Sequence, residues 1–138
     1  MVLAVLMGSV AVESPARAED PFVPGKVEVL VGPAGEKLTV VHAKPMDKNL
    51  ALIKFENTGS EWDGRVLLHE VSERAGRGKY DYITGTWTTV TIRGSGFASI
   101  EVFVRGVEGS FRARYDKDAP AKVNAQAVVD EYEKLPRP

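Results

Sequence analysis

Residues 80–115, YDYITGTWTTVTIRGSGFASIEVFVRGVEGSFRARY, decide the fold class. Apolar and aromatic residues fill its runs, and glycine-bearing turns separate the runs at residues 94–96 and 106–109. Short runs of this composition, bounded by glycine, are typical of antiparallel strands joined by hairpins. Gly85 interrupts the first run, where a bulge or bend would divide it. The stretch therefore predicts a meander of strands at residues 80–84, 86–93, 97–105 and 111–115.

Similar apolar runs, again separated by turn residues, precede the meander. They predict further strands at residues 26–31, 37–43, 50–56 and 66–71. Within 50–56, Ala51, Ile53 and Phe55 form an apolar set on one face of a pleated strand. The run 66–71 is apolar on both sides, as expected for a strand in a sandwich core. We expect a mainly β fold, namely a single antiparallel β-sandwich of about seven strands, immunoglobulin-like in broad architecture, over residues 26–117.

The last part of the chain changes to a helical period. Over residues 118–135 one apolar stripe recurs at helical spacing, made of Ala121, Ala125, Val128, Tyr132 and Leu135. Asp118 is the expected N-cap, and Pro136 is expected to stop the helix. Because an isolated helix of this length is only marginally stable in water, we expect one C-terminal α-helix packed on the sandwich.

The amino terminus carries an apolar run, VLAVLMGSVAV at residues 2–12, followed by Ala16-Arg17-Ala18. This is the arrangement of a secretory signal peptide with an A-x-A cleavage site, although no Lys or Arg precedes the run. The run is shorter than the roughly 20 residues that cross a bilayer as a helix. We expect residues 1–18 to be a signal peptide, residues 19–25 an extended leader, and the mature protein to be periplasmic or secreted. The alternative is a first strand or helix of the mature fold.

The composition excludes several classes of function. A net charge of −1 lacks the basic footprint of a nucleic-acid binder or a polybasic membrane binder. The absence of cysteine excludes a thiol nucleophile, a disulfide framework, a Cys-ligated zinc site and an iron–sulfur cluster. The chain has no glycine-rich nucleotide motif and no nucleophile-elbow serine motif, so we predict no cofactor and no enzymatic activity.

Two histidines remain as candidates for chemistry. His42 and His69 both lie inside predicted strands, and Met46 follows His42 closely. Because imidazole and thioether ligands together favour copper, one alternative function is a periplasmic copper carrier that uses His42, Met46 and His69. Residues 53–70 are loosely similar to the strand-loop-strand passage of periplasmic copper chaperones, but Val71 stands where their motif has a methionine. Structural roles for both histidines, or a small hydrolase without a recognisable motif, are the remaining alternatives.

A binding surface is the better-supported prediction. In the paired meander, one face of the first long strand is expected to carry Trp87, Thr89, Thr91 and Arg93. Tryptophan and arginine are favoured anchors at protein interfaces, although the same face could be a solvated set of cross-strand pairs. The sequence thus predicts an exported, non-enzymatic binding or accessory protein that contacts a partner protein or an envelope component. The expected contact residues are Trp87, Arg93, Phe103, Arg105, Arg112 and Arg114.

Overall fold

A computed structural model describes residues 21–74, 79–84, 87–94 and 100–134. The predicted signal peptide, Gly85, Leu135 and most of the first glycine turn of the meander lie outside these residues. The strands are β1 (Pro24–Val31), β2 (Lys37–Ala43), β3 (Leu50–Glu56), β4 (Val66–Arg74), β5 (Lys79–Thr84), β6 (Trp87–Gly94), β7 (Ile100–Val104) and β8 (Phe111–Tyr115). Short 3₁₀ turns, η2 (Met46–Lys48) and η3 (Ala119–Lys122), and the helix α3 (Ala125–Lys134) complete the described elements.

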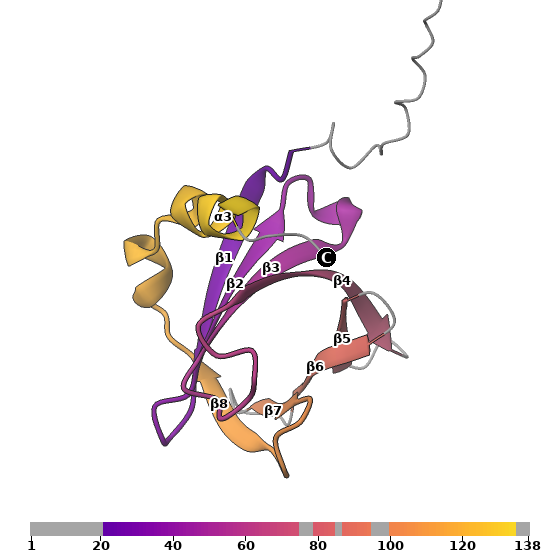
Figure 1. Cartoon of the computed structure of the whole chain (residues 1–138), viewed down its shortest axis with the longest axis vertical. Helices are drawn as coiled ribbons and strands as arrows, with labels where there is room; N and C mark the ends of the chain where they lie inside the picture. The colour runs from indigo at the N-terminus through magenta and orange to yellow at the C-terminus, as the bar shows by residue number, and fades with distance from the viewer. Residues whose placement is uncertain (1–20, 75–78, 85–86, 95–99, 135–138) are drawn as a thin grey trace, which may run out of the picture.

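The eight strands form one closed antiparallel barrel in chain order (Figure 1). Each strand pairs with the next, and β8 returns to pair with β1, where Leu30 lies opposite Tyr115 and Val31 opposite Arg114. Beside this seam, the Asp116 N–H donates a hydrogen bond of 2.9 Å to the carbonyl of Val29. The prediction of mainly β structure with a C-terminal helix is confirmed, but the predicted open sandwich of about seven strands is wrong.

The apolar residues on both sides of the early strands explain this difference. Leu38 and Val40 of β2 point into the barrel and join its core, whereas Val41 points outward and is equally buried. The outward side is covered by α3, whose Val128 and Val129 pack on Val41 and on residues of β3 and β4. A helix, and not a second sheet, therefore buries the outer face of these strands.

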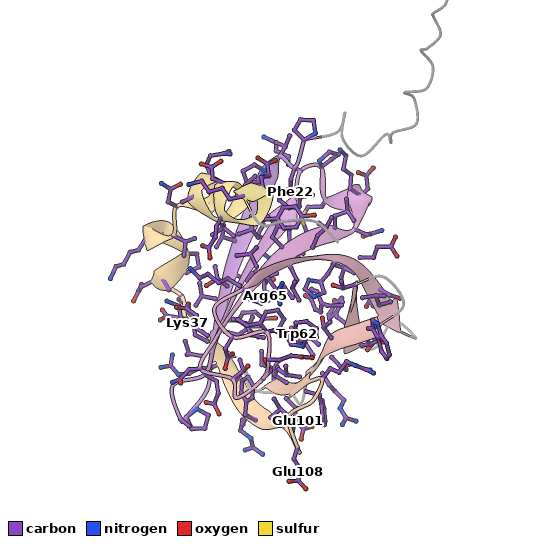
Figure 2. All side chains as sticks on the ribbon, in the orientation of Figure 1. Phe22, Lys37, Trp62, Arg65, Glu101 and Glu108 are labelled. Carbon is purple, nitrogen blue, oxygen red and sulfur yellow. The ribbon has the colours of Figure 1, made fainter. Side chains whose placement is uncertain are left out.

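The helical segment at the carboxyl end forms two pieces. Residues 119–122 make the 3₁₀ turn η3, and α3 begins at Ala125. The Asn124 side chain accepts a hydrogen bond of 3.0 Å from the Ala127 N–H, which satisfies one of the free donors at the helix start. Figure 1 shows α3 against the outside of the early strands, and Figure 2 shows Phe22 beside it.

One end of the barrel is closed by the loop between β3 and β4. Asp63 accepts hydrogen bonds from the backbone N–H groups of Thr58 (2.9 Å) and Gly59 (2.8 Å), which folds the loop back on itself. Trp62 of this loop then packs against the barrel core (Figure 2). Phe111 and Val107 pack on the core as well. We call this end, where β3 and β5 finish, the Trp62 end.

The packing of the core predicts how much stability the side chain of Phe55 contributes. This side chain is fully buried inside the barrel, and its ring centroid lies 6.1 Å from that of His69. The substitution Phe55→Ala should lower the free energy of unfolding by about 3 to 5 kcal/mol, because it leaves a cavity that the barrel cannot close. Denaturant melts measure the loss, and the exposed loop variant Glu61→Ala should change it by less than about 0.5 kcal/mol. A loss below about 1 kcal/mol for Phe55→Ala would contradict the barrel packing.

Candidate functional site

A cavity of about 250 Å³ lies at the barrel end opposite Trp62, where β1, β3 and β5 begin and β2, β4 and β8 finish. We call it the mouth cavity. Polar and aromatic side chains make up most of its lining, in contrast to the apolar core beneath. The lining residues are Lys26, Glu28, His42, Met46, Asn49, Leu50, Val71, Tyr80, Tyr82 and Tyr115.

Strand alternation brings the polar residues to this end. On β1, Glu28 shares a face with the core residue Leu30, and on β2, His42 shares a face with Leu38 and Val40. Both strands reach the same barrel end, since they are antiparallel neighbours in the sheet. Glu28 and His42 therefore point inward, just above the apolar core.

Glu28 and His42 form a hydrogen-bonded pair. His42 Nε2 donates to Glu28 Oε1 over 2.8 Å, and the two side chains are 12% and 23% exposed, respectively. The ammonium of Lys26 lies 3.6 Å from the other carboxylate oxygen, Oε2, and is itself 63% exposed. The bond from His42, aided by the charge of Lys26, holds the pKa of Glu28 below its ordinary value. The carboxylate is accordingly ionised at neutral pH.

Three tyrosines form the aromatic part of the lining. Tyr80 and Tyr82 lie two residues apart on β5 and share its inner face, and Tyr115 ends β8. Tyr115 is 42% exposed, but partial desolvation raises its pKa to about 12, and the negative charge of Glu28 adds to the effect. Burial and the same carboxylate also raise the pKa of Tyr82. The phenols of Tyr82 and Tyr115 stay neutral over the physiological range and can both donate and accept hydrogen bonds.

His69 lies deeper in the barrel and does not line the mouth cavity. It is hydrogen-bonded through Nε2 to the Thr89 hydroxyl at 2.5 Å. Thr89 reaches it because β6 carries a bulge: Tyr82 lies opposite Val90 and Ile83 opposite Thr88, so Thr89 is an extra residue. The predicted outward face shared by Trp87, Thr89, Thr91 and Arg93 is broken at this point, since Thr89 is buried with its hydroxyl at His69.

The predicted copper ligands are divided between two environments. His42 and Met46 both line the mouth cavity, and Met46 is 53% exposed on η2. His69 instead lies in the core, between the rings of Phe55 and Tyr82. Among the residues that the structure describes, no group of three or more His, Cys, Asp or Glu side chains is arranged to hold a metal ion.

The predicted partner-binding residues lie on β6, β7 and β8, except for Arg105, which directly follows β7. Trp87 is 55% exposed, and the guanidinium carbon of Arg105 lies 3.9 Å from its ring centroid. Arg93 similarly lies over the ring of Phe103 at 5.4 Å, and its Nη2 is 3.4 Å from Glu101. Arg112 and Arg114 are exposed on β8, and Arg112 is the cross-strand neighbour of Glu101. The structure thus brings these residues together as two stacked pairs and two separate arginines.

Sequence reasoning did not single out Glu28, Tyr80 or Tyr82. Strand alternation could have shown that these residues face inward, because each lies two residues from an apolar or aromatic neighbour on the inner face of its strand. An inward-facing carboxylate indicates a candidate site only when several strands place polar residues at the same end of the barrel. That coincidence depends on the closed topology, which the sequence did not reveal.

The burial of His69 predicts that the stability of the protein depends on pH. Burial lowers the pKa of His69 to about 4, so the folded protein holds this imidazole neutral while the unfolded chain protonates it below about 6.5. The unfolded state then binds more protons, and stability is lost as the pH falls from about 6.5 toward 4. We expect the free energy of unfolding to drop by about 2 to 3 kcal/mol from this group between about pH 7 and pH 4.5.

Two measurements test this predicted loss of stability at low pH. Denaturant melts at the two pH values give the loss, and NMR of the folded protein follows the His69 ring directly. A His69 imidazole that becomes protonated above about pH 6 in the folded protein would contradict the prediction.

Comparisons with known proteins do not indicate a function for this chain. Searches against protein-family models, curated proteins and solved structures found no match for the chain. Within the described residues, no helix combines the length and the apolar character needed to cross a membrane.

Proposed function

We propose that this protein binds a small organic molecule in the mouth cavity. The observation that carries the proposal is the unequal filling of the barrel. Its interior is packed with apolar side chains and closed by Trp62 at one end, whereas polar and aromatic side chains surround a space of about 250 Å³ at the other. An eight-stranded barrel is just wide enough either to fill itself with side chains or to hold one small ligand.

The size and lining of the mouth cavity suit such a ligand. A cavity of about 150 Å³ is enough for a benzene molecule, so the space here admits a substituted ring or a short branched chain. Leu50 and Val71 offer apolar contact, and the tyrosines offer both ring faces and hydroxyl groups. Ligand sites combine apolar walls with a few polar groups that fix orientation, and Glu28 with His42 would supply the latter.

Filling the mouth cavity tests the proposal. Val71 lines it from β4, and its neighbour Glu70 is exposed on the opposite face of the strand. Val71→Trp should abolish binding because the indole occupies the space, whereas the matched variant Glu70→Trp should bind like the wild type. Ligand-observed NMR with a panel of small aromatic and aliphatic fragments measures binding, and thermal melts confirm that both variants fold. Equal binding by Val71→Trp, or no binding by the wild type, would refute the proposal.

The outer face of β6 to β8 supports a second candidate function. Here the protein would be a non-enzymatic accessory subunit, periplasmic or secreted, that contacts an acidic surface of a partner protein. The specific support is the exposed Trp87 with Arg105 stacked on its ring, because desolvated aromatic and arginine groups are common interface anchors. Arg93, Arg112 and Arg114 add positive charge to the same strands.

The double variant Trp87→Ala with Arg112→Ala tests this second function. We expect it to lose at least about tenfold in affinity for a partner captured from the envelope fraction, identified, purified and rebound. Its fold should hardly change, since both side chains are exposed. Undiminished rebinding at equal thermal stability would remove this face from consideration.

A further inference from the structure

We propose that the ligand of the mouth cavity carries a protonated amine, which pairs with Glu28, attached to a small apolar or aromatic body. This inference rests on the proposed small-molecule function and adds the chemical class of the ligand. It is carried by the position of one carboxylate oxygen, by the aromatic walls around it and by the lysine that already lies beside it.

Glu28 has one committed oxygen and one available oxygen. Oε1 accepts the 2.8 Å hydrogen bond from His42, which fixes the orientation of the carboxylate. Oε2 has the Lys26 ammonium as its neighbour at 3.6 Å, which is too far for a hydrogen bond. Among the described residues that line the mouth cavity, Glu28 is the only acidic one. Glu28 therefore lines a space large enough for a ligand and has one oxygen with spare acceptor capacity.

The aromatic walls suit a cation as well. Tyr80, Tyr82 and Tyr115 all line the mouth cavity, and the faces of tyrosine rings attract cations. The lining of the mouth cavity thus combines one carboxylate with three electron-rich rings.

Lys26 shows which kind of group this site accepts. Its ammonium is a primary amine cation belonging to the chain itself, and it lies at the rim on the available side of Glu28. The side chain is 63% exposed, so the pair is held weakly and a ligand amine can displace it at little cost. Leu50 and Val71 would then pack against the body of the ligand. Lys26 is therefore a competitor of a cationic ligand, but it would be an attractive partner for an anionic one.

The preference for a cationic ligand can be tested with three matched probes: 2-phenylethylamine, 2-phenylethanol and 3-phenylpropanoate. They share a phenyl ring and differ in charge at the end of a short chain. Affinities would be measured by NMR titration of the full-length protein at about pH 8, where the amine probe is protonated and the carboxylate probe is ionised. We expect the amine to bind about tenfold more tightly than the alcohol, and the carboxylate to bind most weakly.

Two variants separate the charge effect from the shape of the mouth cavity. Glu28→Gln keeps an acceptor for His42 but removes the charge, so it should bring the affinity for the amine down to that for the alcohol. Lys26→Met removes the competing ammonium, so it should raise the affinity for the amine by about three- to tenfold. The exposed variant Lys122→Met, on η3, removes the same charge outside the mouth cavity and should leave all three affinities unchanged.

The outcomes distinguish this inference from the function on which it rests. If none of the probes binds and the fragment panel also fails, the small-molecule function itself is overturned. If the alcohol or the carboxylate binds as tightly as the amine, or if Lys26→Met weakens amine binding, the amine inference is wrong while the binding function stands. Thermal melts of each variant show whether a lost affinity reflects a lost fold.

Discussion

The pairing of β1 with β8 is the constraint on which the rest of the structure depends. It consists of a short seam around Leu30 and Tyr115, reinforced by the hydrogen bond from Asp116 to Val29. Without it the same eight strands would form an open sheet with Glu28 and Tyr115 near opposite edges. Closure removes both edges, encloses one apolar core and brings the first and last strands to the same cavity.

Local structure was largely predictable and global closure was not. The eight predicted strand segments lie close to the observed strands, because alternation and glycine turns are local signals. A sandwich and a barrel share this alternation, however, and the seam joins residues more than 80 positions apart in the chain. The two-sided burial of β2 to β4 was ambiguous for the same reason, since a helix distant in sequence can cover a strand as well as a second sheet can.

The candidate site was likewise predictable only in part. The inward orientation of His42 and His69 follows from strand alternation, since Leu38, Val40, Leu67 and Val71 on the same faces pack in or against the core. The partner of each histidine could not be predicted. Glu28 reaches His42 diagonally from the neighbouring strand, where Glu28 itself lies opposite Val40, and Thr89 reaches His69 through a bulge. Such single-residue shifts reverse the face of a side chain and leave little trace in composition.

The helix α3 covers the strands on one side of the mouth cavity and leaves those on the other side uncovered. Glu28 and His42 come from β1 and β2, in the part of the sheet that the helix covers and that Lys54 ties to Glu131 at 3.1 Å. Tyr80, Tyr82 and Tyr115 come from β5 and β8, outside that helical layer. Because local opening is rarer where a second layer buries apolar surface, the polar pair is the fixed reference of the site. We expect Tyr80 and Tyr115 to be the part of the wall that adjusts to a bound ligand, whereas Tyr82 is held in the barrel core.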